Sequence, residues 1–201
     1  MGLFHDRLER WREYNRISGA GEIARRAFVN NSFDGVLTMT GVVMGSFVVG
    51  VQDPKVVLVT GLSTALAIGI SGGWGAYLAE SAERSQDIDE LQQVTLTDMA
   101  DTKIGRASRA AVVTVAAVDG LSPFFSAFVV VLPFFFAALL PAIWYAYYAA
   151  LALALLSLFG LGVYLGRLSK RNLILSGIRT AFAGVVSMLL SYLLERVSKL
   201  V

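Results

Sequence analysis

The stretch from Ala110 to Gly166 contains a single charged residue, Asp119, and is too long for one membrane crossing. About 20 apolar residues in an α-helix span the roughly 30 Å hydrocarbon core of a bilayer. By this criterion the chain holds five apolar segments, at approximately 33–52, 56–79, 110–132, 142–166 and 173–194, with a turn around Pro133 to Pro141. Because 56% of the 201 residues are hydrophobic and only 16% are charged, the sequence predicts an all-α polytopic membrane protein with five transmembrane helices.

The positions of the basic residues predict the orientation of these spans, since loops rich in Lys and Arg stay in the cytoplasm. Fourteen of the 17 basic residues lie in the N-terminal segment, in the connection between the second and third spans, or around the connection between the fourth and fifth. The opposite side carries Lys55, Arg196 and Lys199. We therefore expect the N-terminus in the cytoplasm and the C-terminus outside or in a lumen.

Residues 1–26 are expected to form a basic amphipathic cytoplasmic segment, followed by a five-span membrane domain over residues 27–201. Apolar side chains recur at steps of three or four, and arginines occupy the other face; the apolar positions are Phe4, Leu8, Trp11, Tyr14 and Ile17. A helix of this kind lies on an anionic cytoplasmic leaflet. Alternatively it extends or packs on the first span, and the pattern does not choose between the two.

The connection between the second and third spans, residues 80–107, is short and acidic. Its first part holds seven of the 15 acidic residues of the chain. Glu83, Asp87 and Glu90 follow each other at steps of four and three, so a helix would gather them on one face. There they would attract divalent cations as hard oxygen ligands, or simply form a solvated charged face.

Two aspartates lie within the apolar segments and are the strongest candidates for an ion site. A charged Asp at the centre of a membrane helix costs about 2.5–3.5 kcal/mol on insertion scales, so water, a cation or a proton must compensate it. Asp119 lies near the middle of the third span, and Asp34 follows the polar residues Asn30, Asn31 and Ser32. Both precede a glycine, which allows close packing or local unwinding. Met44 offers a softer sulfur ligand.

Several classes of function are excluded. The chain has no cysteine and one histidine, so disulfides, thiolate metal sites and multi-histidine sites are impossible. A net charge of +2 gives no reason to expect nucleic-acid binding. No nucleophile paired with a base and no cofactor motif appears, and we therefore expect neither an enzyme nor a bound cofactor.

Three segments resemble the vacuolar iron transporter family when taken in order. Asn30-Asn31-Ser32-Phe33-Asp34-Gly35-Val36 resembles the first span of that family, which carries an essential aspartate in the membrane. The segment Ser71-Gly72-Gly73-Trp74-Gly75-Ala76-Tyr77, with Arg84-Ser85-Gln86 after it, resembles the end of the second span. Ser176-Gly177-Ile178-Arg179, followed by Gly184, resembles the start of the fifth.

The sequence also departs from that family. Where the family usually has Met and Glu in the second span, this chain has Gly72 and Ala76. Glu80 lies one helical turn after Ala76, on the same face, and is the expected substitute from nearer the cytoplasm. Asp119 is the expected replacement for the lost charge within the membrane. The cytosolic connection is also shorter than the metal-collecting domain of the family's iron transporters. The chain therefore resembles a divergent member.

The resemblance implies a homodimer that exports a divalent metal, typically ferrous iron, from the cytoplasm in exchange for protons. Asp34, Asp119 and Glu80 are then the expected metal ligands, with Asn31, Met44, Glu83, Asp87 and Glu90 as accessories. The expected partners are the bilayer, a second copy, divalent cations and protons, and the expected location is the plasma membrane of a prokaryote. Two alternatives remain: a transporter or channel for a non-metal substrate, and a non-transporting membrane interaction protein.

Overall fold

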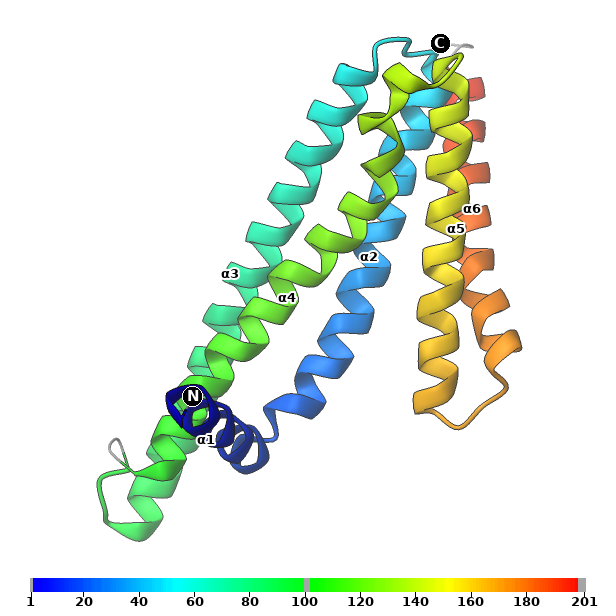
Figure 1. The fold of residues 1–201 in the computed structure, drawn as a ribbon. Coiled ribbons are helices and arrows are strands. Elements are labelled where there is room, and N and C mark those ends of the chain that lie inside the picture. Colours follow the sequence, from blue (N-terminus) through cyan, green and yellow to red (C-terminus); the bar gives the residue numbers. More distant parts are fainter. Residues whose placement is uncertain (1, 100–101, 199–201) are drawn as a thin grey trace. The chain divides into compact units, whose positions relative to one another are not determined.

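The computed structural model describes residues 2–99 and 102–198, and every regular element in these residues is helical (Figure 1). The elements are α1 (Gly2–Ser18), α2 (Ala20–Val49), α3 (Pro54–Thr95), α4 (Lys103–Phe135), the short 3-10 helix η1 (Ala137–Leu139), α5 (Ile143–Leu168) and α6 (Leu173–Ser198). The helices α2 to α6 are each long and apolar enough to cross a membrane. This confirms the prediction of an all-α polytopic membrane protein with five spans.

The helices are longer than the apolar segments that predict them. Helix α2 begins at Ala20, ahead of the window that starts at Phe33, and α3 continues to Thr95 instead of ending near Ala79. Hydropathy registers only the part of a helix that prefers lipid, whereas backbone hydrogen bonding continues through polar and charged residues. Glu83, Asp87, Asp89 and Glu90 are therefore carried on a direct extension of α3, whereas Asp98 follows the end of that helix.

Contacts within the chain form two compact units. Unit 1 combines residues 1–28 with 70–121, and unit 2 combines residues 29–69 with 122–201. The boundaries fall inside α2, α3 and α4, so each of these helices contributes to both units. Asp34 belongs to unit 2, whereas Asp119 and Glu80 belong to unit 1.

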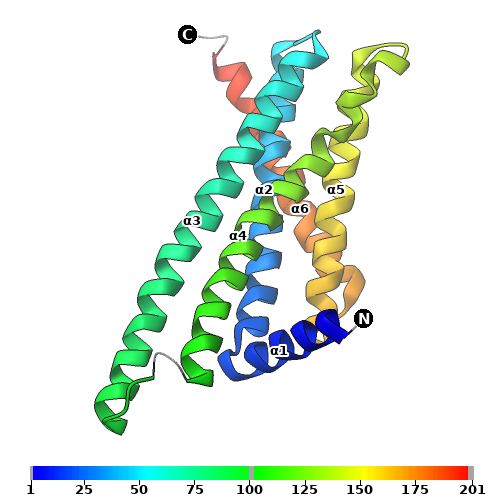
Figure 2. The same cartoon turned by 60° about the vertical axis from the view of Figure 1, so that its left-hand side comes forward.

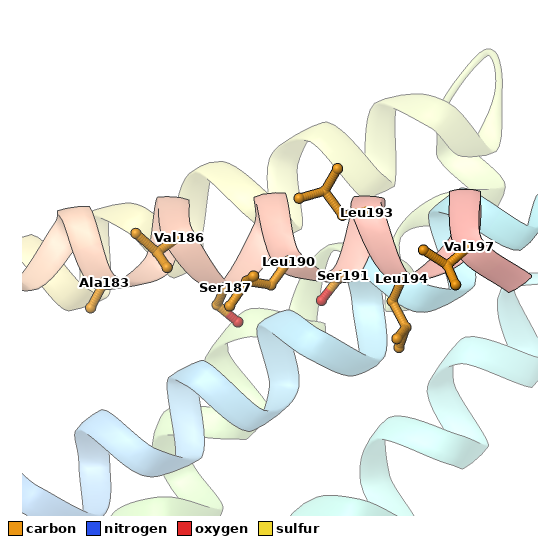
Figure 3. Close-up of a pocket in the computed structure, with 8 residues that line it drawn as sticks. All are labelled: Ala183, Val186, Ser187, Leu190, Ser191, Leu193, Leu194 and Val197. Atoms are coloured by element: carbon orange, nitrogen blue, oxygen red, sulfur yellow. The ribbon is translucent and has the colours of Figure 1, made fainter.

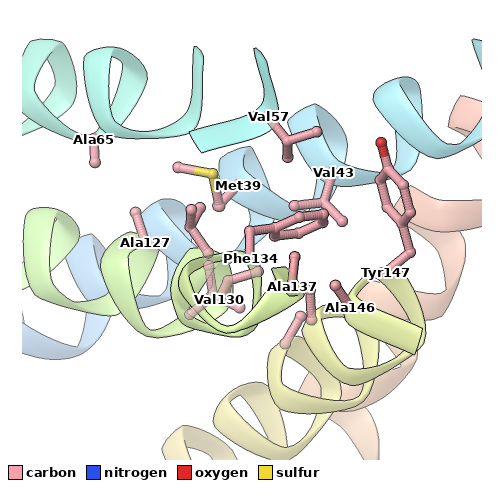
Figure 4. Packing of buried hydrophobic residues seen from close by; sticks show 14 of the residues in the cluster. Met39, Val43, Val57, Ala65, Ala127, Val130, Phe134, Ala137, Ala146 and Tyr147 are labelled. Atoms are coloured by element: carbon pink, nitrogen blue, oxygen red, sulfur yellow. The ribbon is translucent and has the colours of Figure 1, made fainter. Parts of the chain in front are cut away.

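The core of unit 2 is an apolar cluster made by α2, α3, α4 and α5 (Figure 4). Met39 and Val43 of α2 are fully buried in it. The rings of Phe134 and Tyr147 meet edge to face, with centroids 4.9 Å apart. The Tyr147 hydroxyl donates a hydrogen bond of 3.0 Å to the carbonyl oxygen of Val51, so the polar end of this buried ring is satisfied. The part of α2 that carries Asp34 is therefore packed into this cluster through its opposite face.

Helices α5 and α6 form a hairpin with a seam of small residues. A Cβ atom added at Gly162, Gly177 or Gly184 would collide with atoms of the opposite helix. The Thr180 hydroxyl lies 2.8 Å from the carbonyl oxygen of Leu158 on α5 and can donate to it. Small residues and a hydroxyl at the contact are the usual means by which membrane helices approach closely.

In unit 1, α1 is separated from α2 by a single residue. Gly19 has φ +66°, a left-handed conformation that ends the first helix and that other residues rarely adopt. Figure 2 shows α1 running across the direction of the first turns of α2. The terminal nitrogens of Arg84 lie 3.4 Å from the carbonyl oxygen of Ser18, which anchors the end of α1 to α3.

Helix α1 packs on α4 rather than continuing the first span. Tyr14 and Asn15 line a narrow crevice with Ala111 and other residues of α4. Lys103 forms a 2.8 Å ion pair with Glu13, and its hydrogen bond and charge lower the pKa of that carboxyl. Trp11 is still 48% exposed as a residue. The described part of the apolar face of α1 is therefore divided, with Tyr14 against α4 and Trp11 largely open.

The side of the membrane on which each terminus lies stays a prediction. If the distribution of basic residues sets the orientation, tags fused to the two ends will report opposite sides: the N-terminal tag protected in sealed right-side-out vesicles, and the C-terminal tag accessible. Protease protection or a thiol-reactive probe on introduced cysteines measures this directly, since the native chain has no cysteine. Two tags on one side would contradict an odd number of spans.

Candidate functional site

Asp34 lies in the middle of α2, on a face that unit 2 leaves uncovered. Its side chain is exposed, and within the described residues its carboxylate makes no hydrogen bond or ion pair. Asn30 and Thr38 lie one turn before and after it on the same face. Further along this face, a Cβ atom added at Gly41 or Gly45 would meet nothing within 4 Å. The result is an open polar and small-residue stripe along α2.

The neighbour of Asp34 explains why its side chain turns outward. An added Cβ at Gly35 would collide with the carbonyl oxygen of Pro123 and the hydroxyl of Ser126, and would lie 2.7 Å from the Pro123 Cα atom. Gly35 therefore marks the point where α2 touches the backbone of α4. Adjacent positions on a helix point about 100° apart, so this contact directs Asp34 away from α4. Helix α2 is continuous here, without the local unwinding that the glycine would permit.

The methionines of α2 have different roles. Met39 is fully buried in the core of unit 2, where its sulfur packs near Gly61 of α3. Met44 is partly buried and lies ten residues after Asp34, or about 15 Å along the axis at about 1.5 Å per residue. The side chains of Asp34 and Met44 in one chain are therefore too far apart to bind the same ion. Asn31 is partly buried beside Asp34.

Asp119 lies near the middle of α4 and is partly buried. Here α3 approaches so closely that a Cβ atom at Gly72 would lie 2.8 Å from the Asp119 carbonyl oxygen. A Cβ at Gly73 would lie 3.4 Å from the Cα atom of Gly120. The absence of a side chain at position 72, where the related family usually has Met, therefore lets two helix backbones touch beside a carboxylate in the membrane.

Glu80 forms an ion pair with Arg84 on the next turn of α3. The Nε atom of Arg84 lies 3.0 Å from the Glu80 carboxylate, and the two side chains are only 13% and 14% exposed. Because Arg84 also binds the carbonyl oxygen of Ser18, Glu80 orients the residue that anchors α1. Along α3, Glu80 lies about 12 Å from Gly72, at about 1.5 Å per residue. Glu80 is therefore well separated from the level of Asp119.

The structure does not bring the predicted ligands of either unit together in one cluster. Within the described part of the chain, no group of three or more His, Asp or Glu side chains is arranged to hold a metal ion. The three carboxylates on the extension of α3, Glu83, Asp87 and Glu90, are all exposed on a continuous helix. This is the helical face that their spacing predicts.

A groove of about 640 Å³ runs along α6 in unit 2 (Figure 3). Its lining residues all come from α6 and include two hydroxyls one turn apart, Ser187 and Ser191. The other lining side chains are apolar, among them Leu190 and Leu194. Among the residues whose side chains the structure describes, none that lines this groove carries a titratable group.

Sequence reasoning missed two features of these sites. One is the role of Arg84, whose link to Ser18 joins residues far apart in sequence; its spacing from Glu80 indicates only the local ion pair. The other is the contact of Gly72 and Gly73 with α4. The Gly-Gly pair indicates that something approaches the backbone closely, but it does not identify the partner helix.

Comparison with known proteins agrees with this architecture. A sequence model of the VIT family matches the chain over residues 25–103 and 86–196. An uncharacterized protein of Methanocaldococcus jannaschii is 29% identical over 179 residues, which cover 88% of this chain and 91% of that protein. The family match extends over most of the chain and includes all five spanning helices. The chain therefore belongs to the VIT family, a family of membrane transporters of metal ions.

Proposed function

We propose that this protein is a homodimer that exports a divalent metal ion, with ferrous iron as the first candidate, from the cytoplasm in exchange for protons. The observation that carries this proposal is Asp34, an exposed carboxylate in the middle of a membrane-spanning helix. Exposure to lipid would cost about 2.5–3.5 kcal/mol on insertion scales. A functional protein must therefore cover this face or fill it with water and cations.

The open stripe along α2 supports the proposal that a second copy of the chain covers the face that carries Asp34. Gly41 and Gly45 have the spacing that lets two membrane helices approach closely, and neither meets another side chain of its own chain. Two copies of α2 facing each other would bring two Asp34 carboxylates to one axis. Paired carboxylates bind a divalent cation with hard oxygen ligands.

The chemistry of a carboxylate supports exchange with protons. It binds either a proton or a cation, and this mutual exclusion is the minimal element of antiport. In the proposal Asp34 is the principal site and Asp119 a second site in the membrane. Glu80 acts at the cytoplasmic mouth, where an incoming cation would compete with Arg84 for its carboxylate. We place the protein in the plasma membrane of a prokaryote.

The test of this function is reconstitution in liposomes. Purified protein is assayed with a panel of divalent cations outside or inside and a pH-sensitive dye in the lumen. We expect saturable movement of ferrous iron or a related cation, accompanied by proton movement in the opposite direction. Metal flux that leaves the luminal pH unchanged would remove the antiport, and flux of only non-metal substrates would overturn the proposal.

Gly41→Leu is expected to disrupt the dimer without unfolding the subunit. The position is open within the chain, so the larger side chain fits in the monomer but blocks close contact between two α2 helices. Size-exclusion chromatography with light scattering should show a smaller particle. Gly160→Leu on α5, which is equally open, is the matched control and should leave the dimer intact. A Gly41→Leu protein that remains dimeric would place the interface elsewhere.

Replacing Glu83, Asp87 and Glu90 together with Gln is expected to weaken uptake at limiting metal and to leave the saturated rate nearly unchanged. These exposed carboxylates raise the local cation concentration without forming the transport site. The measurement is initial flux against metal concentration, at low and high ionic strength, since salt screens such steering. An unchanged apparent affinity would assign the three residues to an ordinary solvated face.

A further inference from the structure

Unit 1 contains a cavity of about 560 Å³ that the transport proposal does not use. It is lined by three elements: Trp11 and Asn15 of α1, Glu22 and Arg25 of α2, and Thr114 and Val118 of α4. Gly19, the left-handed break between the first two helices, also lies at its wall. Because all of these residues belong to unit 1, the cavity is a property of that unit alone.

Two contacts outside the cavity link α1, which forms one of its walls, to α3 and α4. Arg84 binds the end of α1 at the Ser18 carbonyl, and Lys103 pairs with Glu13 on the same helix. These contacts fix the position of α1 against α3 and α4. The wall formed by Trp11 and Asn15 is therefore part of the folded structure.

The polar part of the lining carries both signs of charge. Glu22 and Arg25 lie three positions apart, where helix side chains are neighbours, and both are exposed. Within the described residues they form no ion pair with each other or with other groups. An unpaired carboxylate and an unpaired guanidinium side by side suit a ligand that itself carries a cation and an anion.

Asn15 adds an unsatisfied acceptor to this lining. Its Oδ1 atom is buried and has no hydrogen-bond donor, which costs free energy. The amide packs against Gly21, where an added Cβ would lie 2.9 Å from Nδ2. Because Asn15 lines the cavity, a ligand that brings N–H groups to it would offer the donor that this oxygen lacks.

The other part of the lining is apolar. Val118 and Ala24 line it, and Trp11 provides an aromatic ring of the kind enriched at the level of lipid headgroups. Arg25 lies two residues before the apolar part of α2, which begins at Ala27, whereas Val118 lies inside the apolar part of α4. The cavity therefore extends from charged to apolar segments, as the headgroup region of a bilayer does.

We propose that this cavity binds an aminophospholipid through a phosphoethanolamine headgroup. The phosphate would bind Arg25, and the primary ammonium would bind Glu22 and the Asn15 amide oxygen, with the ring of Trp11 beside it. The start of the acyl chains would lie on Ala24 and Val118. A purely anionic headgroup would leave Glu22 facing a negative charge, and a choline headgroup has no N–H to donate.

The experiment compares three lipids and one soluble headgroup on the detergent-purified 201-residue protein. Binding of phosphatidylethanolamine, phosphatidylcholine, phosphatidylglycerol and free phosphoethanolamine is titrated by native mass spectrometry and by thermal shift. We expect phosphatidylethanolamine to bind at least about fivefold more tightly than the other two lipids, taking roughly 1 kcal/mol for one added charge interaction. Free phosphoethanolamine should bind more weakly than any of the lipids, because it lacks the apolar contacts.

Four variants assign the effect to the cavity. Glu22→Gln should abolish the preference for ethanolamine over choline, and Arg25→Gln should weaken both lipids about fivefold. Ala24→Phe, which fills the space, should remove the specific binding. Arg26→Gln is the matched control, because Arg26 is exposed and basic but does not line the cavity.

Three results would overturn the proposal. The first is phosphatidylglycerol binding as tightly as phosphatidylethanolamine. The second is an unchanged ethanolamine preference in both Glu22→Gln and Ala24→Phe, which would place the lipid elsewhere on the protein. The third is free phosphoethanolamine binding as tightly as the lipid, which would make the ligand a soluble metabolite. Each variant is first checked for folding by size-exclusion chromatography. If Ala24→Phe fails this check, Val118→Phe replaces it as the variant that fills the cavity.

Discussion

Asp34→Asn protein reconstituted in liposomes is expected to lose metal flux and metal-driven proton movement together. The substitution keeps the shape of the side chain but removes the charge that exchanges a proton for a cation. Since the Asp34 side chain is exposed and makes no hydrogen bond or ion pair within the described residues, no contact inside the subunit is lost. The protein should still insert into the membrane and assemble. Its yield from membranes reports the insertion, and size-exclusion chromatography reports the assembly.

One control and one comparison variant make this result specific. Asp53→Asn removes an exposed carboxylate from the connection between α2 and α3, where its oxygen accepts a hydrogen bond of 2.9 Å from the Lys55 amide; it should leave flux at the parental rate. Asp119→Asn should have the milder effect of the two membrane substitutions. Parental flux and intact proton exchange in Asp34→Asn would show that this assignment is wrong and would make Asp119 the better candidate.

Gly72→Met, which introduces the residue that the family usually has at this position, should destabilise the protein instead of improving it. The added Cβ would lie 2.8 Å from the carbonyl oxygen of Asp119, an atom of the main chain of α4 that cannot rotate away. Forcing extra atoms into a packed contact typically costs about 1–3 kcal/mol. We expect a lower thermal unfolding midpoint in detergent and reduced transport, both measured against parental protein.

Gly75→Ala is the control for this substitution, because a Cβ at Gly75 meets nothing within 4 Å. Exchanging glycine for alanine inside a helix usually stabilises it by roughly 0.5–1 kcal/mol. The two glycines lie three residues apart on the same helix, so opposite effects would separate close packing from helix propensity. Parental stability of Gly72→Met would mean that α3 and α4 are farther apart at this level than the structure places them.

The spans could be predicted from sequence because lipid selects for apolar runs, and α5 shows this most clearly, with its whole length apolar up to Arg167. The ends could not. Helix α2 begins before Arg25 and Arg26, and a hydropathy window discards such residues although they are helical. The break at Gly19 had a signal in Ser18-Gly19, since glycine commonly follows a helix end, but glycine is also tolerated inside membrane helices, as at Gly41.

The candidate site could be predicted one helix at a time. Asp34 and Asp119 stand out because a charge in an apolar run is costly. Which side of α2 is covered depends on packing between segments distant in sequence, such as Gly35 against Pro123. The pairing of Glu80 with Arg84 follows from helical spacing, but the additional bond of Arg84 to Ser18 does not. Features that depend on one helix, such as the pairing of Glu80 with Arg84, can therefore be predicted from sequence, and those that depend on two helices cannot.

The seam between α5 and α6 has a consequence for the kinetics of assembly. The two helices are consecutive, and only residues 169–172 separate them, so closing the loop between them costs little chain entropy. Contacts of this kind are local in sequence and form fast. Because the glycines and Thr180 fit α5 and α6 to each other, this pair can associate as soon as both helices are in the bilayer. We therefore expect the α5–α6 hairpin to form before it packs against the other helices.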